Sequence, residues 1–213
     1  MNIASEIANK LLEIEAVKIN FKNPFTWTSG LRSPIYCDNR KTLSYPEVRK
    51  IITKGYVEYI KGTYKRVNVI AGIATAGIAQ GALIAEELNL SYCYVRPEPK
   101  KHGMKNQIEG HLIDHANMVL IEDLISTGMS SLKAVEACRA EGANVLSVIS
   151  IFNYGFDDAK NAFQEADCEF FSLCTLNDLM EQAVLKNYVK ASDFESLNLW
   201  RSNPKAWSAA QSV

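Results

Sequence analysis

The feature that most constrains the fold is an alternation of apolar strands and helices between residues 67 and 175. Strands are predicted at 67–73, 91–96, 117–123, 144–152 and 168–175, and helices at 76–89 and 130–142. Strands with nearly continuous apolar runs are buried on both faces, which is typical of a parallel sheet covered by helices. The sequence therefore predicts an α/β fold with a mostly parallel, twisted sheet flanked by helices. In such sheets, ligands bind outside the carboxyl ends of the strands.

The flanking segments are expected to complete a single domain of 213 residues. Apolar residues at helical spacing predict an amphipathic helix over residues 2–15, and a second helix is predicted over 45–64. Residues 17–46 combine β-forming residues with Asn-Pro, Ser-Gly and Ser-Pro turns, which favours short strands. We expect a small N-terminal subdomain over about 1–45, a core over about 46–175 and a C-terminal helical segment over about 176–213.

Composition and charge argue against several classes of partner. A formal net charge of -1 gives no overall field that would attract nucleic acid or a membrane. Glu6, Glu13 and Glu15 interrupt the apolar N-terminal pattern, so no signal peptide is predicted, and no apolar run reaches the ~18 residues that span a bilayer. The five cysteines form no C-x-x-C pair and are expected to be reduced, packed thiols. A cytoplasmic protein is expected.

Small residues follow the first predicted strand in the segment IAGIATAGIAQG. Ala74, Thr75, Ala76 and Gly77 lie where this strand gives way to a helix. Small residues let the backbone approach a ligand, and a helix start offers free N–H groups and the positive end of its dipole, which suits a phosphate or diphosphate. The alternative is tight strand–helix packing, which this segment alone favours. Neither the dinucleotide motif G-x-G-x-x-G nor the P-loop motif is present.

The segment VLIEDLISTGMSS places Glu122 and Asp123 at the end of a predicted strand, followed by a loop of hydroxyl residues and glycine. Gly128 permits an unusual backbone angle, and the helix expected to begin near Ser130 offers N–H groups to a phosphate. The acids would repel a phosphate, but they can hydrogen-bond a diol or act through Mg²⁺. A ribose 5′-phosphate would satisfy both halves. The alternative is a helix start decorated with acids, but their position at a strand end favours function.

A third strand-end loop, VRPEPKKHGMKNQIEGH, has no apolar periodicity and is the most basic stretch of the chain. Loops longer than about 12–15 residues are usually functional or disordered. One interpretation is a cationic flap that closes over a polyanion and excludes water. The other is a run of charged residues exposed to solvent. The basic residues of this flap are Arg96, Lys100, Lys101, His102 and Lys105.

Together these segments resemble, in order, the motifs of a known enzyme family. VLIEDLISTGMSS resembles the motif by which type I phosphoribosyltransferases bind 5-phosphoribosyl 1-diphosphate (PRPP). FTWTSGLRSPIYCDNR, IAGIATAGIAQG and YVRPEPKKHGMKNQIEG are similar to motifs of the orotate phosphoribosyltransferase family, in its bacterial branch. The match runs from about residue 20 to 155, with looser similarity as far as WRSNPKAW.

The resemblance implies a type I phosphoribosyltransferase fold with a small N-terminal hood. It implies the reaction of orotate with PRPP to give orotidine 5′-monophosphate and diphosphate, in the synthesis of UMP and other pyrimidine nucleotides. Mg²⁺ would be reached through PRPP and water, with no direct protein ligand assigned. The family also implies a homodimer in which the flap of one subunit acts in the site of the other.

The resemblance also implies roles for individual residues. Glu122 and Asp123 would bind the ribose hydroxyls, Ser126 would also touch orotate, and residues 29–36 would form the hood over the orotate ring. The catalytic candidates are Lys100, His102 and Asp123. The implied PRPP-binding residues are Arg96, Lys100, His102, Glu122, Asp123, Leu124, Ile125, Ser126, Thr127, Gly128, Met129 and Ser130, together with Ala74, Thr75, Ala76 and Gly77 of a diphosphate loop.

The chain departs from the family pattern at several places, one of which is Pro97, since some relatives have a basic residue directly after the flap arginine. Thr28 stands where many relatives have a lysine, and Met129 is bulkier than the residue that usually follows Thr-Gly. The uncharged residues 152–154 occupy the region where some relatives place an arginine that binds the carboxylate of orotate. Arg32 and Arg40 are candidates to replace that cation, and a surface role is the alternative for both.

Other aromatic residues and functions carry less weight. Tyr56 and Tyr59 are expected on a helix surface or in a dimer contact, and Trp27 is expected either to cover a base or to pack within the hood. Two alternative functions remain. One is a phosphoribosyltransferase for another base; the other is a PRPP-binding regulator of transcription, which would need a basic DNA-binding extension that this sequence does not show.

Overall fold

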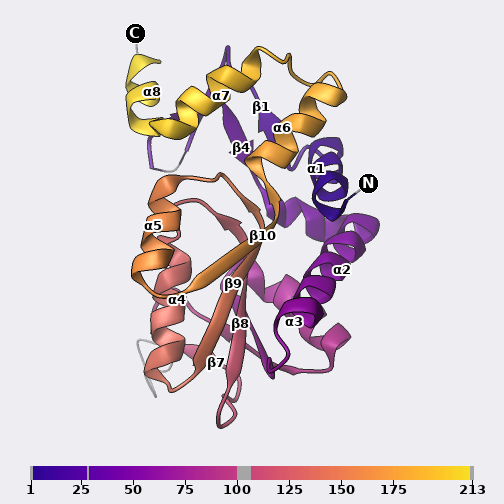
Figure 1. Ribbon diagram of the computed structural model, residues 1–213, viewed down its shortest axis with the longest axis vertical. Helices are drawn as coiled ribbons and strands as arrows, with labels where there is room; N and C mark the ends of the chain where they lie inside the picture. Colours follow the sequence, from indigo (N-terminus) through magenta and orange to yellow (C-terminus); the bar gives the residue numbers. More distant parts are fainter. Residues whose placement is uncertain (1, 28, 100–106, 212–213) are drawn as a thin grey trace.

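The structure, a computed structural model, describes residues 2–27, 29–99 and 107–211. Helices and strands alternate over most of this length (Figure 1). The helices are α1 (Ile3–Glu13), α2 (Pro46–Thr63), α3 (Gly77–Leu88), α4 (Met129–Ala140), α5 (Asp157–Glu165), α6 (Leu176–Leu185), α7 (Asp193–Ser202) and α8 (Pro204–Ala210), with a 3-10 helix η1 (Asn39–Ser44). The strands are β1 (Val17–Ile19), β2 (Phe25–Thr26), β3 (Arg32–Ser33), β4 (Ile35–Cys37), β5 (Val69–Ile73), β6 (Ser91–Val95), β7 (Ile108–Glu109), β8 (Asn117–Ile125), β9 (Asn144–Asn153) and β10 (Glu169–Thr175).

The main sheet has six strands in the order β10-β9-β8-β5-β6-β7. All neighbouring pairs are parallel except β6 and β7, which are antiparallel. Every residue of β5 is buried, as are most residues of β8 and β9, so the central strands read as continuous apolar runs. The predicted α/β fold with a mostly parallel sheet is confirmed.

Helices cover both faces of this sheet, with α2 and α3 on one side and α4 and α5 on the other (Figure 1). The buried apolar residues accordingly form two clusters. The larger contains side chains of α1, α2 and α6, and the smaller contains side chains of α4 and α5. None of the described helices is long and apolar enough to cross a membrane. The five cysteines are unpaired, and all but Cys37 are buried, which agrees with the packing predicted for most of them.

A smaller unit of short strands lies above one end of the sheet (Figure 1). Strands β1 and β4 pair in an antiparallel ladder, and so do β2 and β3. The C-terminal helices join these strands: the backbone N–H of Arg32 in β3 donates to Oγ of Ser208 in α8, at 2.8 Å. On the neighbouring side, α1 packs against α6 and β10. The hood is therefore assembled from both ends of the chain.

The structure departs from the sequence prediction in three elements. Strand β8 continues through Ile125, because β9 pairs with it as far as Ile125. Glu122 and Asp123 therefore lie within the strand, near its end. Helix α5 was not predicted, since it is short and buries only Ala159 and Phe163. The two-residue strand β7 was also not predicted, because it exists only through pairing with β6.

Candidate active site

Three of the loops singled out in the sequence begin at the same edge of the sheet. β5 lies between β6 and β8, and all three strands are parallel, so their carboxyl ends are adjacent. Gly72 of β5 lies opposite Ile121 of β8, and the N–H of Ala74 donates to the carbonyl of Val95, at 2.8 Å. The loops after β5, β6 and β8 therefore surround one position, which is where a ligand binds in sheets of this class.

The loop after β5 is held by close backbone packing. A Cβ atom on Gly77 would overlap the carbonyl oxygen of Ile121, and one on Gly72 would lie 2.6 Å from the carbonyl oxygen of Gly77. Helix α3 therefore approaches the sheet at a distance that only glycine allows. Thr75 is exposed at the tip of this loop. Packing alone requires glycine at residues 72 and 77, whatever the loop binds.

The two acids of β8 lie in different environments. Glu122 is only 6% exposed, and its carboxylate accepts hydrogen bonds from the N–H of Asp123 at 3.0 Å and from Oγ of Ser131 at 3.4 Å. Asp123 is less buried, so its carboxylate is the more accessible of the pair. The backbone carbonyl of each acid is also held: Nδ2 of Asn39 donates to that of Asp123 at 2.7 Å, and the hydroxyl of Tyr56 donates to that of Glu122 at 2.8 Å.

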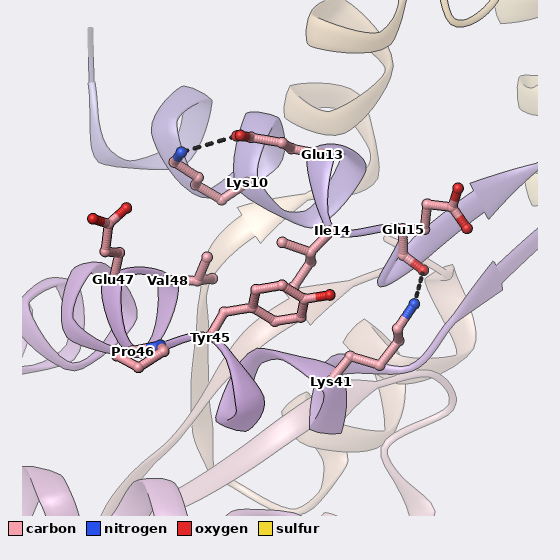
Figure 2. Close-up of a pocket in the computed structure, with 9 residues that line it drawn as sticks. All are labelled: Lys10, Glu13, Ile14, Glu15, Lys41, Tyr45, Pro46, Glu47 and Val48. Carbon is pink, nitrogen blue, oxygen red and sulfur yellow. Dashed lines mark hydrogen bonds and ion pairs between the residues drawn. The ribbon is translucent and has the colours of Figure 1, made fainter.

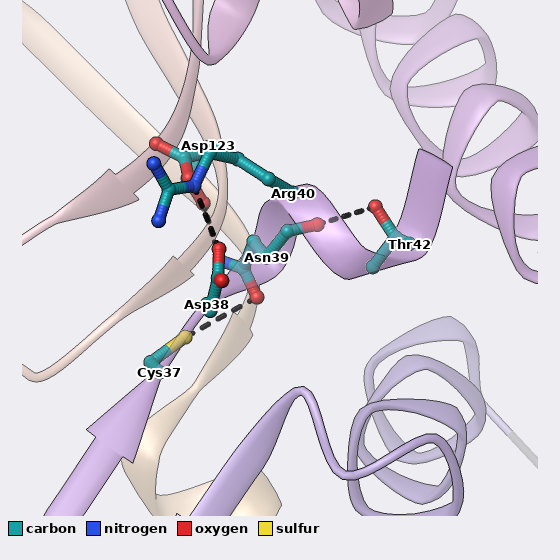
Figure 3. Close-up of polar contacts among 6 residues, drawn as sticks. All are labelled: Cys37, Asp38, Asn39, Arg40, Thr42 and Asp123. Atoms are coloured by element: carbon teal, nitrogen blue, oxygen red, sulfur yellow. Dashed lines mark hydrogen bonds and ion pairs between the residues drawn. The ribbon is translucent and has the colours of Figure 1, made fainter. Parts of the chain in front are cut away.

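These two contacts were not foreseen from the sequence. Tyr56 was expected on a helix surface, and this prediction is wrong: its side chain is fully buried, because its hydroxyl reaches the strand that carries the acids. The 3-10 helix η1 begins at Asn39, and the side chain of Asn39 is turned toward Asp123 (Figure 3). The hood motif thus extends to the acid pair, and Asn39 and Tyr56 are positioning residues for it.

The two cations proposed to replace the missing arginine are engaged elsewhere. Nε of Arg40 forms an ion pair with Oδ1 of Asp38 at 2.7 Å, and its guanidinium lies beside Asp123 (Figure 3). Arg32 is exposed and donates to the backbone carbonyl of Gln211, which fixes it to the C-terminal helix. Arg40 therefore contributes positive charge at the acid pair, whereas Arg32 has a structural contact.

Burial changes the proton affinity of both acids. It raises the pKa of Glu122 well above its usual range, and the negative charge of Asp123 raises it further. Burial also raises the pKa of Asp123, but the interaction with Glu122 and the charge of Arg40 oppose this shift. Of the pair, Glu122 is the residue that keeps its proton to higher pH.

The Glu122→Gln substitution is therefore expected to stabilise the protein at neutral pH. Above the ordinary glutamate pKa of 4.5, the unfolded chain loses the Glu122 proton while the folded chain retains it. The folded state then binds more protons, so wild-type stability falls as pH rises through this window, and the loss persists at neutral pH. The variant lacks this titration, and its Tm should exceed the wild-type value by roughly 2–4 °C for each kcal/mol recovered. Thermal unfolding between pH 4.5 and pH 8 measures this, and a pH-independent Tm difference would contradict it.

The loop after β8 has the backbone geometry expected of a phosphate site. Gly128 has φ +79°, and a Cβ atom there would lie 2.8 Å from a ring carbon of Phe163. Helix α4 begins at Met129, and among the described residues no side chain caps it, so its first N–H groups face the loop. Met129 is 61% exposed and its bulk therefore does not crowd the loop. Thr127 and Ser130 are also exposed.

The flap begins and ends on neighbouring strands. Arg96 follows β6 directly; its N–H donates to the carbonyl of Gln107 at 2.9 Å, and its guanidinium pairs with Oε1 of Glu109 in β7 at 3.2 Å. The base of the flap is thus a short hairpin at the ligand-binding edge. The catalytic candidates Lys100 and His102 lie outside the described residues.

One cavity of the described residues lies away from this edge. It has a volume of about 840 Å³ and lies between α1, η1 and the start of α2 (Figure 2). Its cations are already partnered, since Lys10 pairs with Glu13 at 2.9 Å and Lys41 donates to the backbone carbonyl of Glu15 at 3.0 Å. A smaller cavity, of about 240 Å³, adjoins the phosphate loop. Its lining includes Trp27, Leu31, Ser126, Thr127, Phe156 and Arg201.

Comparison with known proteins agrees with this geometry. No family model matches the chain. The chain is 50% identical to the orotate phosphoribosyltransferase of Cytophaga hutchinsonii over 207 residues, which cover 97% of this chain and 99% of that protein. It is 48% identical to the orotate phosphoribosyltransferase of Listeria innocua, with the same coverage. The crystal structure of orotate phosphoribosyltransferase from Aeropyrum pernix is similar, with a TM-score of 0.74, 27% identity, and coverage of 84% of this chain and 98% of that one.

The sheet order, the acid pair within β8 and the glycine-led start of α4 define an enzyme of the type I phosphoribosyltransferase class. Sequence identities of 50% and 48% over nearly the full length identify one family within this class. The chain belongs to the orotate phosphoribosyltransferase family. The predicted fold and family are thereby confirmed.

Proposed function

We propose that this enzyme transfers the 5-phosphoribosyl group of PRPP to N1 of orotate, giving orotidine 5′-monophosphate and diphosphate for UMP synthesis. Near-full-length similarity to the orotate phosphoribosyltransferases carries this proposal. The geometry supports it, because an acid pair and a phosphate loop lie next to each other at the carboxyl edge of the sheet. One ligand that combines a ribose with a 5′-phosphate fits both features.

Different residues of the site bind the ribose, the 5′-phosphate and the diphosphate of PRPP. Asp123 and Glu122 bind the ribose hydroxyls, and Ser126 to Ser130 with the N–H groups of α4 bind the 5′-phosphate. Breaking the C1′–O bond develops positive charge on the ribose and negative charge on the diphosphate. The carboxylate of Asp123 offsets the first charge, and the cations of the flap, Arg96, Lys100 and His102, offset the second. N1 of orotate then attacks C1′, aided mainly by positioning.

The residues present fit a role for Mg²⁺. This ion usually binds through one or two carboxylates, substrate phosphates and several waters, without a dedicated protein cage. Asp123 offers an accessible carboxylate at the edge where the diphosphate would lie, whereas Glu122 is turned toward Ser131. Asp123 would thus hold Mg²⁺ through water and PRPP oxygens. When bound, the ion neutralises charge on the leaving diphosphate.

The absorbance of orotate in the ultraviolet tests the reaction directly. We expect the signal to fall when PRPP and Mg²⁺ are both added, and to stay constant when either is omitted. Adenine, guanine and hypoxanthine in place of orotate form the matched control. Turnover of one of these bases without turnover of orotate would assign the enzyme to another base. PRPP binding without turnover of any base would favour a regulatory protein.

We also propose that the enzyme is a cytoplasmic homodimer whose flap acts in the partner's site. In that arrangement, Lys100→Ala and Asp123→Asn inactivate different halves of each composite site. Mixing the two inactive proteins should restore up to about a quarter of wild-type activity, because statistical exchange makes half of the dimers hybrids with one intact site each. Lys100→Ala alone should lower turnover far more than orotate affinity. Confirmed subunit exchange without recovered activity would indicate a self-contained site.

A further inference from the structure

The cavity beside the phosphate loop combines segments that are distant in the sequence. Trp27 and Leu31 come from the β2–β3 hairpin, Thr127 from the loop after β8, Phe156 from the turn before α5, and Arg201 from α7. The volume of about 240 Å³ is small compared with the roughly 300–1,000 Å³ of sites for drug-sized ligands. It suits a single six-membered ring with one substituent.

The walls of this cavity are rigid aromatic faces. Trp27 packs 5.2 Å from Tyr154 and 5.8 Å from Trp200, and Phe156 lies 5.3 Å from Trp200, as distances between ring centroids. Trp200 is fully buried, and Nε1 of Trp27 donates to the carbonyl of Ile35 at 3.1 Å. Trp27 thus packs within the hood and also faces the cavity. Such walls fit a planar heterocycle.

A guanidinium group lies at one side of the same cavity. Arg201 follows the anchored Trp200, so the position of its backbone is fixed by the aromatic cluster. Nη1 of Arg201 donates to Oδ1 of Asn177 at 3.0 Å, its sole hydrogen bond among the residues that the structure describes. The remaining N–H groups of this planar fork are available, and their geometry matches a carboxylate.

Arg201 lies close to Gly155, just beyond the end of strand β9. β9 ends in uncharged residues, and Gly155 follows with φ +71°; a Cβ atom there would lie 3.6 Å from Nη1 of Arg201 and 3.8 Å from Oδ1 of Asn153. The guanidinium therefore lies over the carboxyl end of β9. The N–H of Tyr154 donates to the carbonyl of Ile125 at 3.4 Å, which places this end beside the phosphate loop.

Because of the other charges that line the cavity, an anionic ligand can be attracted there only if Arg201 is present. The two acids Asp157 and Asp158 and the base Lys205 also line the cavity, and all three are exposed. With Arg201 the formal charges of the lining balance, two positive against two negative. Without it the lining is net negative and would repel a carboxylate.

We propose that Arg201 of α7 binds the carboxylate of the heterocyclic substrate and thereby selects orotate over bases that lack this group. The proposal rests on the proposed function above and deepens it. Arg201 is then a specificity-determining residue supplied by the C-terminal segment, in place of a cation on β9.

The test compares Arg201→Gln with wild type in steady-state kinetics and in orotate binding measured by tryptophan fluorescence. Loss of a charge-assisted contact should raise the KM for orotate about 10- to 100-fold and leave the KM for PRPP unchanged. The preference for orotate over uracil, which lacks the carboxylate, should fall by a similar factor. Arg66→Gln is the matched control, because Arg66 is exposed in the loop before β5, at the opposite edge of the sheet.

A second variant guards against misfolding. Arg201→Lys keeps the charge but loses the planar fork, so its orotate KM should lie between those of wild type and Arg201→Gln. An unchanged orotate KM and an unchanged uracil discrimination in a folded variant would overturn the proposal. An equal rise in the KM for PRPP would also overturn it, because it would indicate a general loss of structure. Wild-type protein without orotate turnover would instead reject the proposed function itself.

Discussion

Gly77→Ala is expected to destabilise the protein by roughly 3 kcal/mol, the upper range for an overpacked core. The added methyl group would overlap the carbonyl oxygen of Ile121. That carbonyl belongs to β8, which is held by β5 on one side and β9 on the other, so it has little freedom to move. For a chain of this length, Tm should fall by about 6–12 °C, measured by circular dichroism or calorimetry.

Gly62→Ala is the matched control for this prediction. Gly62 lies in α2, and a Cβ atom there meets nothing within 4 Å. Alanine is the better helix former, so this variant should be more stable than wild type by about 0.5–1 kcal/mol. Equal destabilisation by the two substitutions would mean that α3 does not approach β8 as closely as the structure shows.

Asp123→Asn is expected to cause the larger functional defect. The substitution keeps the shape of the side chain but removes the negative charge of the more accessible acid in β8. Charge-assisted hydrogen bonds contribute about 1.5–3 kcal/mol each, so PRPP affinity and kcat/KM for PRPP should fall roughly 10- to 100-fold for each bond lost. Isothermal titration calorimetry with PRPP measures the binding effect without turnover.

Asp114→Asn provides the control for Asp123→Asn. Asp114 is exposed in the turn before β8, at the amino edge of the sheet and away from the ligand-binding loops. It should leave PRPP affinity unchanged. Wild-type affinity in the Asp123→Asn protein would refute the assignment of this residue to the ribose.

The sequence predicted the sheet because its signal is local. The central strands are apolar over nearly their whole length. The same holds for the loop after β8, where Gly128 adopts the positive φ that its residue type suggested. Short elements such as α5 and β7 were missed, because their stability comes from the sheet beside them.

The supporting residues of the site could not be predicted in the same way. Tyr56 reaches Glu122 across 66 positions of the chain, and Asn39 reaches Asp123 across 84. Arg201 lies beside Gly155 only because α7 folds back over the end of β9. Contacts of this kind depend on tertiary packing, and no periodic pattern marks them. The motifs identified the residues that face the ligand, whereas the structure identified those that hold them.

The pairing of the hood with the end of the chain also orders events during synthesis. Strands β5 to β10 are synthesised before the C-terminal helices, so the contacts of Arg32 with Ser208 and Gln211 form only after α8 has been made. Helix α1 likewise waits for α6. A premature stop codon after β10 would therefore remove Arg201 from the cavity beside the phosphate loop and Trp200 from the larger apolar cluster, so the chain would lose a wall of its site and part of its core together.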